Sequence, residues 1–355
     1  MKKRHFLLRV IVLVLMIVGI TILFFKKGQI TELDTDRHTF QSFHMGSMFT
    51  IVVYAGERSL AEKASNAAFD RIEELNSIMS DYMEDSELNR LSRRSGSGEE
   101  VQVSEPLFEV MKEAKRVSEM TDGLFDVTIG PLTKYWREIR AMSEPALPEA
   151  DTLKNLLDRV GYQYVKLDES RQTVELLKPG MRLDLGGIAK GYAAEEALNV
   201  LEQFGIRSAL VDAGGDMAVG APPPGSGYWE VALPKGQVDG EKRYITLNLY
   251  ETNVTTSGDM YQYVEIDGQR YSHILNPRTG LGVTDPIQAT VVAGRGVLAD
   301  ALASAVALMD PDFGIMFINN LEETEAIIFK NTIEGRLESE ALQEWKTAGF
   351  ERYLK

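Results

Sequence analysis

Apolar residues recur every three or four positions along several stretches, a spacing that predicts amphipathic helices. The longest stretch is residues 59–82, and residues 104–120 carry a second, with Ser104 as its N-cap and Gly123 just beyond its end. Further helices are expected over residues 150–157, 188–204 and 297–309. Asp310-Pro311 is expected to cap another helix, which runs to residue 319, and the tail from residue 339 is also expected to be helical.

Short runs rich in β-branched and aromatic residues predict strands between these helices. We expect a hairpin at residues 164–167 and 173–176, mostly loop at residues 86–103, and short strands and turns over residues 228–257. The other expected strands are residues 46–54, 181–185, 208–212, 287–292 and 325–330. Because strands and helices alternate irregularly, the pattern favours an α+β architecture over a doubly wound sheet.

The N-terminal segment differs from the rest of the chain. Residues 6–25 are apolar except for Arg9 and Thr21, and basic residues flank them. Twenty helical residues span about 30 Å, the thickness of a bilayer core, and no small-x-small cleavage motif follows. We therefore expect residues 1–27 to form an uncleaved membrane anchor; a cleaved secretory signal is the alternative.

The basic residues around this segment also predict an orientation. They are more numerous before the apolar run than after it, so the N-terminus should stay in the cytoplasm. The expected location is the cell membrane, with a single pass and the body on the extracytoplasmic face. Residues 28–42 are then a predicted linker, and residues 43–355 the predicted functional domain.

Composition narrows the possible chemistry. The net charge is −15 and the body has no basic run, which argues against a nucleic-acid partner. The chain has no cysteine, which excludes disulfides, thiolate catalysis, cysteine-bound metals and a cysteine-anchored lipid. With four histidines, any metal would be held mainly by oxygen, which favours magnesium, calcium or manganese.

The segment Asp184-Leu-Gly-Gly-Ile-Ala-Lys190 is the most informative, because it joins a predicted strand to a predicted helix. Backbone N–H groups at the two glycines, the positive helix end and the lysine ammonium together make a site for phosphate or another anion. The segment matches neither G-x-G-x-x-G nor G-x-x-x-x-G-K-[ST], so it argues against Rossmann dehydrogenases and P-loop ATPases. A packing turn is the alternative, but such a turn needs no lysine there.

Two later segments carry groups suited to phosphate and proton chemistry. Ser257 lies in a Thr-Thr-Ser-Gly run whose hydroxyls can hydrogen-bond phosphate or ribose oxygens; a polar turn is the alternative. His273 lies in a predicted short strand before Asn276-Pro277. It is a candidate proton acceptor near neutral pH, although a lone histidine in a strand is more often structural.

Two carboxylates complete the set. Asp300 and Ser304 stand four residues apart in an otherwise apolar helix start, so they share one helix face. A carboxylate in such a setting needs a cation or a donor, which favours a magnesium ligand pair; an N-cap is the alternative. Asp216 follows a glycine pair, which indicates either close approach of a ligand or a turn that Asp216 caps.

In this order and spacing, the segments resemble the ApbE family of FAD:protein FMN transferases from about Met45 to Leu308. The resemblance rests on MGSMF at 45–49, SDY at 80–82 followed by SEL at 86–88, TDGLFD at 121–126, the glycine turn at 184–190, GGD at 214–216, TSG at 256–258, HILNP at 273–277, and the run from Ala299-Asp300 to Ser304.

The resemblance implies a fold and a site. The fold would be α+β, with a mixed, largely antiparallel sheet core flanked by helices. The residues implied at the FAD site are Met45, Tyr82, Leu124, Phe125, Asp126, Asp184, Lys190 and Ile274, to which we add Ser257 of the hydroxyl run. Those implied at a Mg²⁺ site are Gly187, Asp300 and Ser304. His273, with Asp216 second, is the expected catalytic base.

The implied activity is a magnesium-dependent transfer of FMN from FAD to a Thr or Ser hydroxyl of an acceptor protein, with release of AMP. Ser304 replaces the family's usual threonine and keeps its hydroxyl, whereas Asn276 replaces the commoner aspartate and lacks its carboxylate. No flavin-accepting segment is evident in the chain, so the acceptor is expected to be a separate protein, a membrane redox subunit. The alternatives are an FAD pyrophosphatase and a non-catalytic extracytoplasmic FAD-binding protein.

Overall fold

The structure is a computed structural model that describes residues 35–238, 241–258, 263–285, 287–331 and 342–355. The predicted membrane anchor, residues 1–27, lies outside the described residues. Within the described ranges, no helix is both long and apolar enough to cross a membrane.

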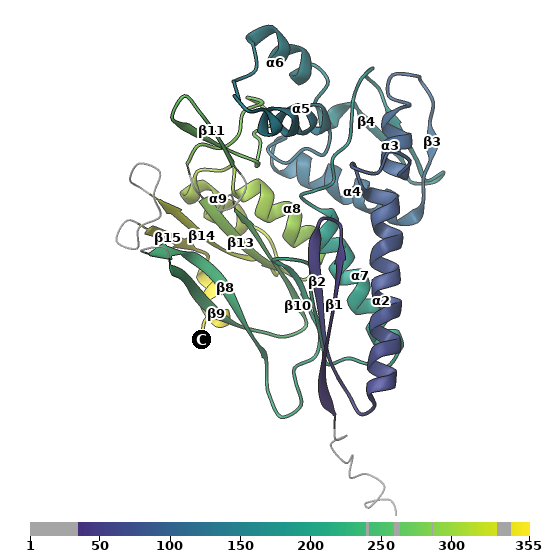
Figure 1. Cartoon of the computed structure of the whole chain (residues 1–355), viewed down its shortest axis with the longest axis vertical. Helices are drawn as coiled ribbons and strands as arrows, with labels where there is room; N and C mark the ends of the chain where they lie inside the picture. The colour runs from purple at the N-terminus through teal and green to yellow at the C-terminus, as the bar shows by residue number, and fades with distance from the viewer. Residues whose placement is uncertain (1–34, 239–240, 259–262, 286, 332–341) are drawn as a thin grey trace, which may run out of the picture.

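An eight-stranded sheet forms the centre of the molecule (Figure 1). Every strand in it pairs antiparallel with its neighbours, which confirms the predicted α+β fold with a largely antiparallel sheet. The strands, in their order across the sheet, are β1 (Asp36–His44), β2 (Ser47–Ala55), β6 (Ala209–Asp212), β7 (Asp216–Val219), β10 (Thr252–Gly258), β13 (Ile287–Ala293), β14 (Glu325–Asn331) and β15 (Leu342–Lys346).

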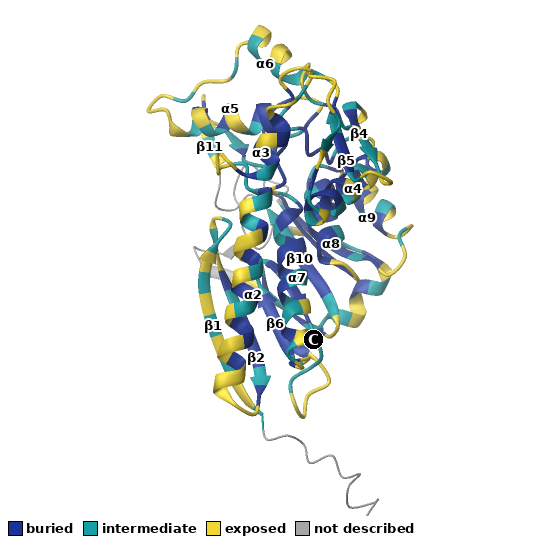
Figure 2. Cartoon of the chain, turned by 90° about the vertical axis from the view of Figure 1, so that its right-hand side faces the viewer, coloured by how far each residue is buried: buried dark blue, intermediate teal, exposed yellow. Residues whose placement is uncertain are grey.

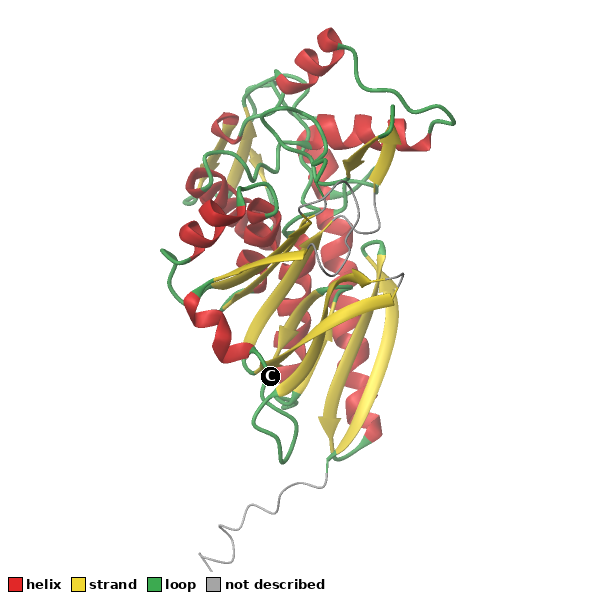
Figure 3. Ribbon diagram, turned by 90° about the vertical axis from the view of Figure 1, so that its left-hand side faces the viewer, coloured by secondary structure: helices red, strands yellow, loops and turns green. Residues whose placement is uncertain are grey.

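Both faces of this sheet are covered. On one face pack α2 (Arg58–Met79), α7 (Ala189–Gln203) and α8 (Gly296–Val306), and α4 (Glu105–Met120) packs against α8. On the other lies the ribbon of β8 (Trp229–Val238) and β9 (Glu241–Leu249) (Figures 1 and 3). Strand β2 shows the consequence: Phe49, Ile51 and Val53 join the core under the helices, while Val52 joins the core under the ribbon.

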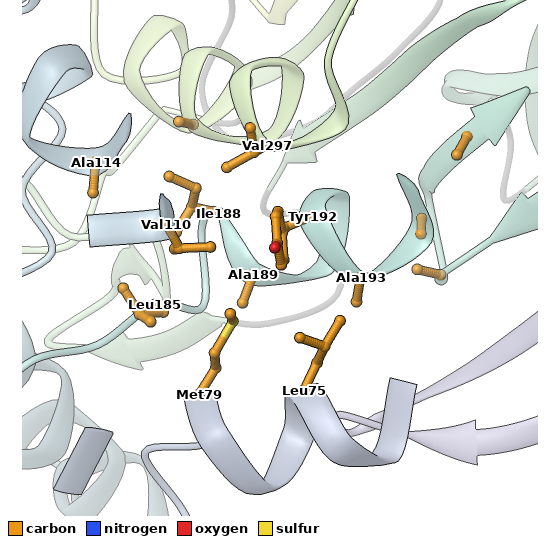
Figure 4. Packing of buried hydrophobic residues seen from close by; sticks show 14 of the residues in the cluster. Leu75, Met79, Val110, Ala114, Leu185, Ile188, Ala189, Tyr192, Ala193 and Val297 are labelled. Carbon is orange, nitrogen blue, oxygen red and sulfur yellow. The ribbon is translucent and has the colours of Figure 1, made fainter. Parts of the chain in front are cut away.

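Helix α7 lies at the centre of the larger core, which fills the space between the sheet and its covering helices. Leu75 and Met79 of α2 point toward Ala189 and Ala193 of α7, and Val297 of α8 approaches α7 from another side (Figure 4). Figure 2 shows α2 exposed along its outer face, whereas α7 is largely buried behind it. This burial fixes the first turn of α7, where the predicted anion site begins.

Smaller elements complete the described fold around the central sheet (Figure 1). A third core gathers around Trp136, between α5 (Gly130–Ala141) and the hairpin of β11 (Tyr263–Ile266) and β12 (Gln269–Ser272). These elements are α3 (Glu87–Ser92), α5 (Gly130–Ala141), α6 (Ala150–Leu157), α9 (Pro311–Ile318), the sheet β3 (Val101–Gln102), β5 (Thr173–Leu176), β4 (Val165–Asp168), the hairpin β11 (Tyr263–Ile266), β12 (Gln269–Ser272), and the 3-10 turns η1 (Tyr162–Tyr164) and η2 (Ala348–Tyr353).

The tail and the linker were predicted wrongly. The tail from residue 339 was expected to be helical, but its described part forms β15 and then η2, because β15 pairs with β14 at the sheet edge. Residues 28–42 were expected to be a linker, yet the described part from Asp36 onward forms β1, which pairs with β2 over its whole length.

Three predictions in the middle of the chain also need correction. Residues 86–103, expected to be loop, contain α3 and β3. Residues 228–257 form two long strands and most of a third instead of short strands. Residues 181–185 are not a strand, because their backbone pairs with a loop: Asp184 N donates to Val127 O (2.8 Å), and Arg182 forms a single bridge with Ile129.

Candidate active site

The predicted glycine turn is built by its own backbone and by the side chain of Asp184. Asp184 Oδ1 accepts from Gly186 N (2.8 Å), and Leu185 O accepts from Ala189 N (2.9 Å), which starts α7. A Cβ on Gly187 would lie only 2.8 Å from Ser304 Oγ. A side chain here would displace the Ser304 hydroxyl, so glycine lets the turn pack closely against α8.

Lys190, in the first turn of α7, forms an ion pair with Asp216 of β7. Asp216 is 2% exposed. Burial by itself lowers the pKa of Lys190, but the carboxylates of Asp216 and Asp300 outweigh it, and the pKa is raised. The ammonium is therefore held charged beside the turn, with part of its side chain still open to solvent.

Asp300, on α8, reaches across to the same helix start. Its Oδ2 accepts from Gly191 N (3.0 Å), and the residue is 3% exposed. Burial and then the charge of Asp216 raise the pKa of Asp300 to about 8, partly offset by Lys190 and by backbone N–H groups. The N-cap alternative is wrong, because α8 begins at Gly296 with Arg295 at its N-cap.

Ser257 at the end of β10 and Ser304 of α8 come together beside Gly187. Their Oγ atoms are 3.3 Å apart. No group of three or more His, Asp or Glu side chains suited to a metal occurs among the described residues. One carboxylate from Asp300, a hydroxyl and nearby backbone nonetheless fit Mg²⁺, which often takes one or two carboxylates and completes its shell with phosphates and water.

The predicted residue Met45 lies beside the loop that leads to Asp216. Met45 and Gly46 have positive φ (48° and 76°) in the tight turn between β1 and β2. Ser47 Oγ, just after this turn, donates to Ala213 O (3.1 Å). The hairpin turn and the loop before β7 are therefore in direct contact.

The loop from residue 213 to 216 is capped by a residue that the sequence reading did not single out. Asp212 Oδ1 accepts from Gly214 N and Gly215 N, both at 2.9 Å. The alternative in which Asp216 caps this turn is therefore wrong. Asp216 is left to pair with Lys190.

The predicted residues Leu124, Phe125 and Asp126 border the glycine turn from another side. A Cβ on Gly187 would lie 3.5 Å from the Phe125 ring. Asp126 is buried, and its carboxylate accepts from Thr128 N (2.8 Å), Thr128 Oγ1 (2.7 Å) and Tyr162 N (2.7 Å). Through these hydrogen bonds the buried Asp126 carboxylate holds the backbone of this segment in place.

His273 follows β12 in a bend and is half-buried, so its predicted place within a strand is wrong. The neighbouring Ile274 packs against the larger core, and its N–H donates to Ser272 Oγ (3.0 Å). Two contacts anchor the rest of the segment: Trp136 Nε1 donates to Gly280 O (2.8 Å), and Arg278 Nη2 donates to Asp122 O (2.7 Å).

Asp184 and the predicted residue Tyr82 are joined by Arg137, which the sequence reading missed. Arg137 Nη2 donates to Asp184 Oδ2 (3.0 Å), and its guanidinium carbon lies 4.1 Å from the Tyr82 ring centroid. Helix α5, which carries Arg137, begins at Gly130-Pro131, a start signal that could have revealed the helix but not the partners of Arg137.

A model of the ApbE family matches residues 45–328, which include all of these site residues. The chain belongs to the ApbE family. This ApbE-family protein is 29% identical over 295 residues to an FAD:protein FMN transferase of Klebsiella pneumoniae, covering 83% of this chain and 89% of that protein. It is 31% identical over 277 residues to the one of Treponema pallidum, covering 74% and 75%.

Solved structures agree with this family. The ApbE-family protein superposes on the flavin transferase ApbE from Vibrio cholerae with a TM-score of 0.80 at 25% identity, covering 90% of this chain and 100% of that one. The ApbE protein from Thermotoga maritima gives a TM-score of 0.79 at 26% identity with the same coverage.

Proposed function

We propose that this protein transfers FMN from FAD to a Thr or Ser hydroxyl of an acceptor protein and releases AMP, in a magnesium-dependent reaction. The observation that carries the proposal is the Lys190–Asp216–Asp300 cluster, which holds one ammonium at a helix start beside Ser257 and Ser304. The relatives named FAD:protein FMN transferase support the same activity.

The reaction exchanges one phosphorus–oxygen bond for another. The acceptor oxygen bonds to the phosphorus of the FMN half, the bond from that phosphorus to the AMP half breaks, and AMP leaves. Lys190, at the positive end of α7, supplies positive charge where the pyrophosphate becomes more negative. Asp300 and Ser304, with the backbone of Gly187, would hold Mg²⁺, which when bound supplies further positive charge to the phosphates.

The acceptor hydroxyl must lose its proton to a nearby base. We assign this role to His273, with Asp216 second. Asp216 is already engaged by Lys190, so taking up a proton would weaken that ion pair. His273→Ala should therefore lower the transfer rate while FAD binding persists. Normal flavinylation by His273→Ala would remove this assignment.

The decisive experiment mixes the protein, FAD, Mg²⁺ and an acceptor polypeptide with a Ser-Gly-Ala-Thr segment. Transfer gives a fluorescent acceptor band on a denaturing gel together with AMP. AMP without the band would indicate an FAD pyrophosphatase, and FAD binding without either product would indicate a binding protein. Asp300→Asn should abolish the magnesium-dependent band, whereas Asp312→Asn, at an exposed position on α9, should not.

We also propose that residues 1–27 anchor the protein in the cell membrane, with the body from β1 onward on the extracytoplasmic face next to a membrane redox subunit as acceptor. Strand β1 has nine residues and so runs about 30 Å from Asp36 to the turn at Met45. The hairpin turn is thus at the opposite end of β1 from Asp36, the first residue of the strand (Figure 1). Membrane fractionation and protease treatment of intact cells test this; a soluble, protected protein would contradict it.

A further inference from the structure

A charged network links the loop at residues 80–83 to the glycine turn. Arg137, on α5, contacts two carboxylates, Asp81 of the loop and Asp184 of the turn. The side chains of these aspartates are 10% and 8% exposed, that of Arg137 28%. The Arg137 guanidinium is therefore held between the loop and the turn by an ion pair at each end.

The backbone of the same loop is held from a second side. Asn89 Nδ2 donates to Asp81 O (3.0 Å) and Met83 O (2.8 Å). Arg182 Nη2 donates to Asp81 O (3.2 Å) and to Asn89 Oδ1 (3.0 Å). The loop is therefore held at the backbone carbonyls of Asp81 and Met83.

The side chain of Tyr82, in the same loop, is exposed to solvent. It is 77% exposed, although both of its neighbours in the loop are held. Arg137 covers one face of its ring at 4.1 Å, an arrangement that stabilises the ring in one orientation. The ring thus provides a fixed aromatic surface against which a planar ligand ring can stack.

We propose that Arg137 is a positioning residue that sets the Tyr82 ring at a fixed distance from the phosphate site. The same guanidinium holds Asp184, whose other oxygen accepts from Gly186 N (2.8 Å) in the turn that leads to Lys190. A flavin nucleotide carries a planar ring at one end and phosphate at the other, so a fixed spacing between the two subsites favours it. That the ligand is FAD rests on the proposed function.

The test separates positioning from mere stability. Arg137→Gln should raise the dissociation constant for FAD, followed by flavin fluorescence, about tenfold, and raise KM for FAD similarly, while kcat at saturating FAD changes less than about threefold. Tyr82→Ala should give a similar rise, and the double variant no further rise, because both changes remove one unit. Arg137→Lys keeps the charge but lacks the planar fork, so it should not restore affinity.

Lys134→Ala, exposed on the same helix, is the matched control and should bind FAD normally. Additive effects of Arg137→Gln and Tyr82→Ala, or a folded Arg137→Gln protein with lower thermal stability but unchanged FAD affinity, would overturn the proposal. If the wild type binds FAD but transfers nothing, the proposed function fails, while the binding data still decide on Arg137. If the wild type does not bind FAD, both fail.

Discussion

The charge states of three neighbouring side chains at the candidate site, Lys190, Asp216 and Asp300, depend on one another. The side chains of Asp216 and Asp300 are almost fully buried, and Asp216 forms an ion pair with the Lys190 ammonium. Asp300 responds with a pKa raised to about 8, caused by burial and by Asp216. A substitution at any of the three therefore changes the balance for the other two.

Lys190→Ala should lower the free energy of unfolding by about 3 kcal/mol, because the buried Asp216 carboxylate then loses its cation. Urea unfolding without ligand measures the change. Lys190→Ala combined with Asp216→Ala should recover part of the loss, since both partners of the pair are then removed. A double variant whose loss equals the sum of the two single losses would show that the pair is not coupled.

Because of Asp126, the free energy of unfolding should fall as the pH rises. Burial raises the pKa of Asp126 above the usual 3.8, and hydrogen bonds from Thr128 and Tyr162 offset part of the rise. The folded state therefore binds this proton more tightly than the unfolded chain. The stabilisation is complete below the unfolded pKa and is lost as the pH rises through the folded pKa.

Asp126→Asn is uncharged at every pH and lacks this dependence. Its destabilisation relative to the wild type should be larger at pH 4 than at pH 7, measured by urea unfolding without FAD. Thr128 keeps its position in both proteins, so the comparison isolates the ionisation of one side chain. A destabilisation that grows with pH would contradict the raised pKa.

At the scale of elements, α7 and α8 approach until backbone meets backbone. A Cβ on Gly191 would overlap the carbonyl oxygen of Gly296 and lie 2.8 Å from the Cβ of Asp300. This closeness allows Gly191 N–H to reach the Asp300 carboxylate. The crossing of the two helices, and not either helix alone, assembles the site.

Gly191→Ala should therefore force α7 and α8 apart and lower the free energy of unfolding by about 2 kcal/mol, with loss of flavin transfer. Gly227→Ala is the control: nothing lies within 4 Å of its added Cβ, so its stability should change by less than about 0.5 kcal/mol. Thermal and urea unfolding compare the two. Equal stability of the two variants would show that the helices adjust freely.

At the scale of the whole molecule, the described body begins with β1. All nine residues of β1 pair with β2, and Phe40 packs against the larger core. A boundary at residue 43 would remove most of this strand and expose the edge of β2.

Two truncations test this boundary. Removal of residues 1–34 should leave the melting temperature and transfer in solution close to those of the full chain. Removal of residues 1–42 should lower the melting temperature by more than about 5 °C and promote aggregation, because β2 becomes an unpaired edge. Equal melting temperatures would mean that β1 adds little to the fold.

The sequence by itself determined the elements that carry strong local signals. The long periodic helices α2 and α4, the apolar strand β13 and the Asp310 cap of α9 all lie where the pattern placed them. Lys190, Asp300 and Ser304 were visible as separate signals, because each breaks the expected composition of its element. Periodicity and turn chemistry act over a few residues, so one sequence is enough to find them.

Only the tertiary structure decided which of these residues meet. Lys190 pairs with a residue 26 positions away, and Asp300 accepts from one 109 positions away. Arg137 escaped notice because its partners, Asp81 and Asp184, are 56 and 47 positions distant. The tail became β15 only because β14 offered it a free edge. Such contacts depend on how helices cross and strands pair, which packing of the whole chain determines.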